Sequence, residues 1–70
     1  MEIKWKDGSL IRVKTDEGVT IISVNKEGLL SLADQLTALA QETSGSHIHY
    51  DEYNSLEEGS AELIIEKQDL

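Results

Sequence analysis

The residues with the clearest chemical potential in this 70-residue chain are His47, His49 and Asp51, which alternate along a short segment. Alternate residues of a β-strand share one face, so both imidazoles and the carboxylate would point the same way, about 7 Å apart. These groups bind zinc, and a catalytic zinc site uses three protein ligands and a water molecule. The chain has only two histidines, however, and a metal site also needs groups that hydrogen-bond to the ligands and orient them. We therefore predict a polar strand face with no metal and no cofactor, and keep a metal-binding protein or metal-dependent enzyme as an alternative.

Other kinds of catalysis have little support in the sequence. There is no cysteine for thiol chemistry or a disulfide, and no serine lies in a Gly-x-Ser-x-Gly motif. A general acid needs a carboxylate that is desolvated in a cleft, and a chain this short rarely builds one. We therefore predict that the protein is not an enzyme.

Residues 51–59 have a different character, because four acidic side chains surround one tyrosine and one leucine. Protein interfaces are often organised as an aromatic or aliphatic anchor with a charged rim. In the alternative interpretation, this segment is a solvated loop whose leucine folds back onto the core. The predicted partner-binding residues are Asp51, Glu52, Tyr53, Leu56, Glu57 and Glu58.

The formal net charge of −8 is unevenly distributed along the chain. Residues 1–26 carry five basic and four acidic side chains (+1), whereas residues 27–70 carry one lysine and ten acidic side chains (−9), which sum to −8. An acidic block of this size repels phosphate groups, so nucleic acid and anionic membranes are poor partners. The charge favours a basic protein as the partner, although acidity also serves solubility alone.

Alternation and turn signals predict the elements before the helix. Ile3 and Trp5 alternate with polar residues, and Asp7–Gly8 follows as a hairpin turn signal. A second strand is predicted over residues 10–14, and a third, rich in β-branched residues, over residues 19–24. Trp5 is predicted to lie in the core, under the helix.

A helix is predicted from Lys26 to Glu42, with Asn25 as its N-cap and Gly45 near its end. Strands over residues 47–53 and 61–67 follow it. The helix face predicted to pack on the core has apolar residues at helical spacing: Leu29, Leu32, Ala33, Leu36, Leu39 and Ala40.

The predicted fold class is α+β, a single domain over residues 1–70. A mainly antiparallel five-stranded sheet, in the order β-β-β-α-β-β, has one helix packed on one face. The longest apolar runs are far shorter than the ~20 residues of a membrane span, and the N-terminus lacks the apolar region of a signal peptide. We predict a cytoplasmic protein.

Two segments resemble the immunity protein 32 family of bacterial polymorphic toxin systems. One runs from Asn25 to Ala33 (NKEGLLSLA) and on through Leu36 to Gln41. The other runs from Ser46 to Ser60 (SHIHYDEYNSLEEGS) and on through residues 62–67. The resemblance implies a small α+β protein that binds and neutralises a co-encoded toxin.

The resemblance and the charge support the same function, a cytoplasmic immunity protein that blocks a toxin domain sterically through an acidic surface. If that toxin cuts nucleic acid, it presents a basic cleft, which an acidic inhibitor can occupy in place of phosphate. Attraction between the two also accelerates their encounter. The alternative is an adaptor or interaction module without a toxin partner.

Overall fold

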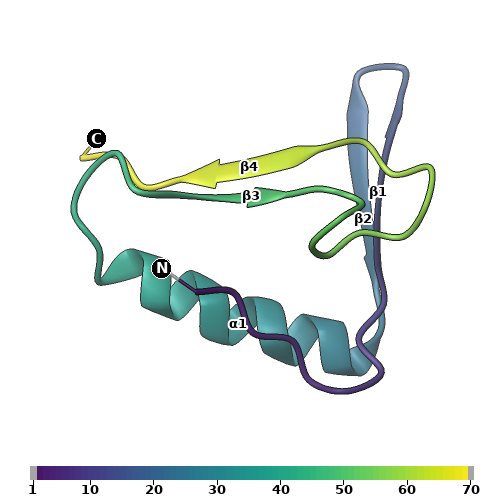
Figure 1. Ribbon diagram of the computed structural model, residues 1–70. Coiled ribbons are helices and arrows are strands. Elements are labelled where there is room, and N and C mark those ends of the chain that lie inside the picture. The colour runs from purple at the N-terminus through teal and green to yellow at the C-terminus, as the bar shows by residue number, and fades with distance from the viewer. Residues whose placement is uncertain (1, 70) are drawn as a thin grey trace.

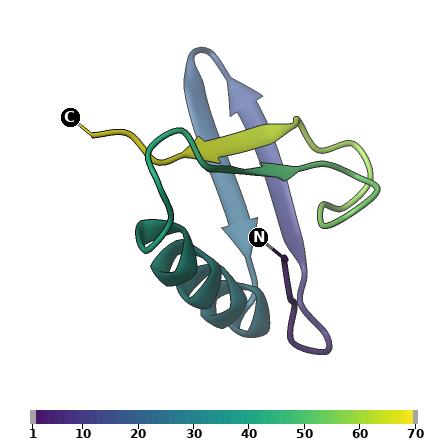
Figure 2. The same ribbon diagram turned by 60° about the vertical axis from the view of Figure 1, so that its left-hand side comes forward.

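The computed structural model describes residues 2–69, and two hairpins and one helix surround its core (Figures 1 and 2). Along the chain the elements are β1 (Ile11–Asp16), β2 (Val19–Val24), α1 (Lys26–Ala40), β3 (His47–Tyr50) and β4 (Leu63–Glu66). β1 pairs with β2 and β3 pairs with β4, each antiparallel, so the structure has two separate two-stranded sheets. Within residues 2–69, no helix combines the length and apolarity that a membrane span requires.

The predicted α+β class is correct, but the five-stranded sheet is wrong. The segment around Ile3 and Trp5 forms no strand and instead lies alongside α1 (Figure 1). Two buried side chains of α1 hold the backbone of this N-terminal segment. The Ser31 hydroxyl accepts from Lys6 N (2.9 Å), and Gln35 Nε2 donates to the Lys4 carbonyl (2.9 Å). These bonds replace the strand ladder that the alternation predicted. The predicted turn does form, with Gly8 at a φ of 83°.

The two hairpins do not merge into one sheet because an irregular segment occupies the second edge of β1. Glu57 N donates to the Ile11 carbonyl and Ala61 N to the Val13 carbonyl, both at 2.9 Å. Val13 N in turn donates to the Ser60 hydroxyl at 3.2 Å. β4 therefore starts only at Leu63, two residues later than predicted, and pairs with β3 alone.

Helix α1 begins where the sequence predicts and ends two residues earlier, at Ala40. The Asn25 side chain is its N-cap: Oδ1 accepts from Gly28 N (2.9 Å) and also from Leu10 N (3.0 Å). At the other end, Lys67 Nζ donates to the Ala40 carbonyl at 2.8 Å. A cation there satisfies a carbonyl group that the helix leaves unpaired and complements the helix dipole. Gly45, predicted near the helix end, lies in the following loop.

The predicted leucine face of α1 is only partly correct. Leu39 is buried, but Leu29 is 56% exposed and Leu36 42% exposed. The helix is turned so that Gly28, Ser31 and Gln35 face inward, where the two polar side chains hydrogen-bond to other segments. Trp5, predicted to lie in the core under the helix, is only half-buried and packs against the core from outside it. The buried apolar residues are Ile11, Val13, Leu39, Ile48, Tyr50 and Leu56.

Gly28 allows the close approach of α1 to the end of β2, which gives a first testable prediction. A Cβ atom at this position would lie 2.5 Å from Val24 Cγ1 and 3.0 Å from the Leu10 carbonyl oxygen. Alanine usually stabilises a helix by about 1 kcal/mol relative to glycine, whereas overpacking costs about 1–3 kcal/mol. We expect Gly28→Ala to lower the free energy of unfolding, measured by urea denaturation. A gain in stability would contradict this contact.

Candidate functional site

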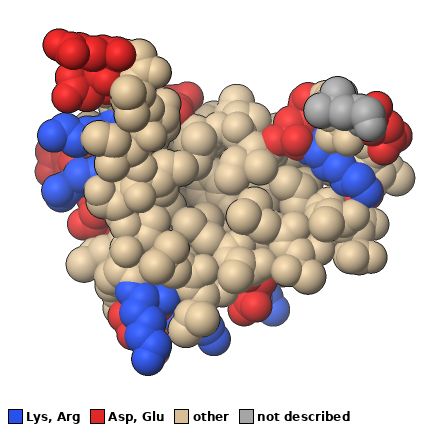
Figure 3. All heavy atoms as spheres, turned by 180° about the vertical axis from the view of Figure 1, so that it is seen from behind, with Lys and Arg blue, Asp and Glu red and all other residues tan. Residues whose placement is uncertain are grey.

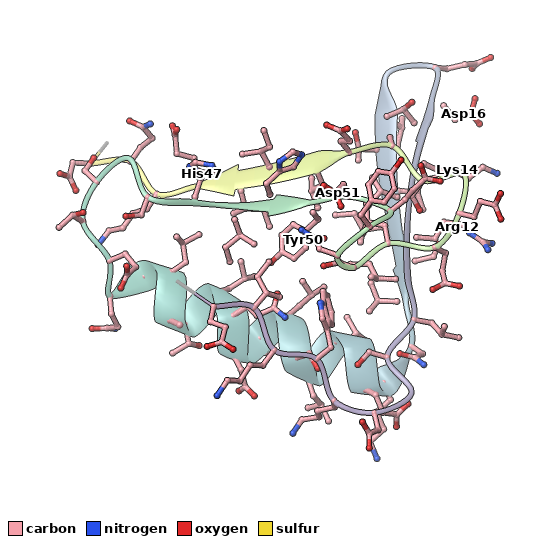
Figure 4. All side chains as sticks on the ribbon, in the orientation of Figure 1. Arg12, Lys14, Asp16, His47, Tyr50 and Asp51 are labelled. Carbon is pink, nitrogen blue, oxygen red and sulfur yellow. The ribbon has the colours of Figure 1, made fainter. Side chains whose placement is uncertain are left out.

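Strand β3 does not bring its two histidines and Asp51 together. His47 and His49 are exposed, whereas Ile48 and Tyr50 are buried. His49 Nε2 lies 3.2 Å from Glu62 Oε2, across the hairpin. Asp51 follows the end of the strand, far from His47 (Figure 4). Among residues 2–69, no three histidine, cysteine or acidic side chains gather in a way that could hold a metal ion.

The acidic loop, residues 51–59, is ordered by its own polar groups. Asp51 Oδ1 accepts from the backbone N–H groups of Tyr53 (2.9 Å) and Asn54 (3.0 Å), which makes a tight turn. Asn54 completes the turn, because its Oδ1 accepts from Asp51 N (3.0 Å) and its Nδ2 donates to the His49 carbonyl (2.8 Å). The Asp51 carboxylate and the Asn54 amide therefore fix the turn at residues 51–54.

The second half of the acidic loop is fastened to the body of the protein. Leu56 is 4% exposed and belongs to the core, and its N–H donates to the Asp51 carbonyl at 2.8 Å. Glu52 Oε2 accepts from Gly59 N at 2.7 Å and ties the two ends of the loop together. The alternative interpretation is thus correct for Leu56, which folds back onto the core.

Tyr53 stands at the turn of this loop with its side chain 99% exposed. Glu52 and Glu58 are exposed, and Asp51 and Glu57 are half-buried. Within residues 2–69, no carboxylate of the loop forms a close ion pair, since the pair found there joins His49 and Glu62. The loop thus combines an exposed tyrosine with carboxylates that form no close ion pair within residues 2–69.

Two basic residues that the sequence did not connect with the loop lie beside it. Arg12 and Lys14 project from β1 on the side of the loop (Figure 4), and Arg12 and Glu57 line the same shallow cavity. They come close because Glu57 N and Ala61 N bind to the second edge of β1. This contact links positions more than forty residues apart, and no local pattern in the sequence signals it. The acidic loop is therefore bordered by a short basic strip.

The structure is a small α+β unit with an ordered acidic loop and an exposed tyrosine. The family model of immunity protein 32 matches residues 19–68, more than half of the chain. The protein therefore belongs to the immunity protein 32 family, and the resemblance seen in residues 25–67 is confirmed. No curated protein and no solved structure matches the chain significantly. Membership of an immunity-protein family indicates a role in toxin neutralisation, and such families are in general not enzymes.

Proposed function

We propose that this protein is a cytoplasmic immunity protein that captures a co-encoded toxin domain with its acidic loop and blocks it sterically. The observation that carries the proposal is the exposure of Tyr53, whose side chain is 99% exposed on a loop held by hydrogen bonds at both ends. A tyrosine offers a large contact area at a low entropic cost, and tyrosine is enriched among residues that dominate binding energy. The family membership supports a toxin as the partner.

The order of the loop favours binding because little conformational freedom remains to be lost in the complex. Asp51 and Leu56 serve this order, through the turn and the core contact, respectively. Tyr53, Glu52, Glu57 and Glu58 supply the surface that meets the toxin. In this division of roles Leu56 supports the contact from within.

The acidic groups select a basic surface, as found in the cleft of an enzyme that cuts nucleic acid. Residues 27–70 carry a net charge of −9 (one lysine, ten acidic residues), so long-range attraction accelerates the encounter. Rim charges are screened over about 8 Å at physiological ionic strength. Charge therefore governs mainly association, and the Tyr53 contact governs mainly dissociation.

Binding kinetics with the toxin domain encoded beside this gene test the proposal. Higher salt should slow association several-fold and leave dissociation nearly unchanged. Glu57→Lys with Glu58→Lys should have the same effect as salt. Tyr53→Ala should accelerate dissociation and reduce protection of cells that produce the toxin, with little change in thermal stability because the side chain is 99% exposed in the free protein.

A charge-matched control places the same two substitutions elsewhere, Asp34→Lys with Glu42→Lys on and after α1, where both residues are exposed. This variant has the same net charge as the loop variant but keeps the loop intact, so its association rate should fall much less. An equal fall of the association rate in both variants would show that only net charge matters. An association rate that changes neither with salt nor with either pair of substitutions would refute capture by the acidic loop.

A further inference from the structure

The side of the molecule opposite the N-terminal segment carries a broad surface without charges, which we call the rear face. Figure 3 shows it as an uncharged area over the β1–β2 hairpin and α1, hollowed near its centre and charged only at its rim. Ile22 of β2 is 43% exposed, and Leu29 and Leu36 of α1 are 56% and 42% exposed. Large apolar side chains that are exposed on an uncharged face are typical of an interaction site.

Strand β2 contributes an open edge to the rear face. The carbonyls of Ile11 and Val13 point away from β2 and accept bonds from residues 57 and 61. In an antiparallel pair, directly opposed residues orient their backbone groups alike, so Val24 and Ile22, opposite Ile11 and Val13, direct theirs away from β1. Within residues 2–69, no backbone hydrogen bond satisfies this edge from Val19 to Val24. The edge is a template for another strand.

Helix α1 contributes an apolar flank. Leu29, Ala33, Leu36 and Ala40 follow the i, i+4, i+7, i+11 spacing and form one stripe along the helix. The N-terminal segment covers the other flank, where it and residues 31, 34, 35 and 38 line one cavity. The stripe is therefore exposed, and the start of the helix that carries it meets the end of β2 at Gly28 and Val24.

The protein exposes more surface than is typical of a monomer of its mass. The protein exposes 5088 Å², whereas a folded monomer of 7.8 kDa is expected to expose about 4,400 Å². The excess of about 700 Å² is close to the ~800 Å² that each partner buries in a standard protein interface. The radius of gyration, 12.3 Å, is likewise larger than the ~11 Å expected for 70 residues.

We propose that the rear face is the interface of a homodimer, in which β2 pairs antiparallel with β2 of a second copy. Two copies with a net charge of −8 repel each other least when they meet through a surface without charges, and the rear face is such a surface. An antiparallel strand edge is self-complementary about a two-fold axis, which is the commonest symmetry of dimers. The absence of acidic groups from this face removes the attraction that a basic partner would require.

The register of the contact follows from the open backbone groups. Thr20, Ile22 and Val24 alternate along the edge, so a two-fold axis at Ile22 pairs Ile22 with itself and Thr20 with Val24 of the other copy. This arrangement joins the β1–β2 hairpins of the two copies into one four-stranded sheet. The acidic loop lies against β1, at the far edge of the same hairpin, so each copy keeps its loop free.

Sedimentation equilibrium of the purified full chain tests the proposal. Interfaces of this size bind with micromolar or tighter affinity, so at about 100 µM the protein should sediment at twice its monomer mass of 7.8 kDa. Leu29→Lys with Leu36→Lys should weaken dimerisation more than about tenfold, because two apolar contacts become charged. Both substitutions also reduce the net negative charge, so repulsion cannot explain the loss.

Leu30→Lys is the matched control, since Leu30 is 47% exposed but lies off the stripe, and it should leave the dimer unchanged. Thr20→Pro tests the strand edge separately, because it removes an outward N–H group at an edge position where proline is tolerated. This variant should remain folded by circular dichroism and become monomeric. A monomer throughout the concentration series, or a dimer that Leu29→Lys with Leu36→Lys and Thr20→Pro leave intact, would overturn the proposal.

Discussion

Replacement of Leu39 by alanine is expected to lower the free energy of unfolding by about 2–5 kcal/mol, the cost of a cavity at a buried leucine. Leu39 is 4% exposed and belongs to the core with Tyr50 and Ile48. A small domain has a stability of only about 0.05–0.15 kcal/mol per residue, so the variant should unfold at a much lower urea concentration. Equilibrium urea denaturation followed by circular dichroism measures the effect.

Leu36→Ala is the matched control, because it makes the same substitution on the same helix at a side chain that is 42% exposed. Its cost should stay below about 1 kcal/mol. The titration should use dilute protein, below the concentration at which the rear face associates. Equal losses at both positions would contradict the orientation of α1, in which Leu39 rather than Leu36 faces the core.

Tyr50→Phe is expected to destabilise the protein by about 1–3 kcal/mol, although it removes only one hydroxyl group. The Tyr50 hydroxyl donates to Gln35 Oε1 at 2.8 Å, and both residues are buried. Without this donor the amide oxygen is left unsatisfied in the interior. Tyr53→Phe removes the same group from a side chain that is 99% exposed and should change stability little. A cost at Tyr53 equal to that at Tyr50 would refute the buried hydrogen bond.

Tyr50 also makes the free energy of unfolding depend on pH in the alkaline range. Burial raises the pKa of the Tyr50 phenol above its ordinary value of 10.0, so the folded state keeps the proton that the unfolded chain loses. The stabilisation that the buried, protonated Tyr50 phenol contributes is therefore complete below pH 10. It falls as pH rises through the raised pKa of the folded state. The stability difference between the wild type and Tyr50→Phe should shrink from pH 8 to pH 10.5 in urea titrations. A difference that stays constant would contradict this account.

Local signals in the sequence predicted the helix and its N-cap because they act within one turn. Asn25 is followed by an amphipathic run, and α1 begins at Lys26 as expected. The inward face of the helix was less predictable, because the apolar residues of α1 cover more than one flank. Ser31 and Gln35 decide the orientation through bonds to residues 6, 4 and 50. Such distant contacts have no periodicity of their own.

In the acidic loop, too, local features could be predicted and distant contacts could not. Its composition suggested an interface, and the exposure of Tyr53 agrees with the anchor that the proposal requires. The sequence left the position of Leu56 open, since a leucine between polar residues suits either an exposed anchor or a core contact. It also gave no reason to place Arg12 beside Glu57, because that proximity results from pairing between β1 and residues 57–61.

The Asn25 side chain couples the start of α1 to the start of β1. Its oxygen accepts from Gly28 N in the helix and from Leu10 N before the strand, and its nitrogen donates to the Gly8 carbonyl at 2.7 Å. The first turn of a helix is the costly step in helix formation, and here the group that satisfies it is shared with a segment fifteen residues earlier. We therefore expect nucleation of α1 and docking of the chain at Leu10 to be coupled. The helix and the first hairpin should then behave as a single folding unit, and neither is expected to persist when the other is cut away.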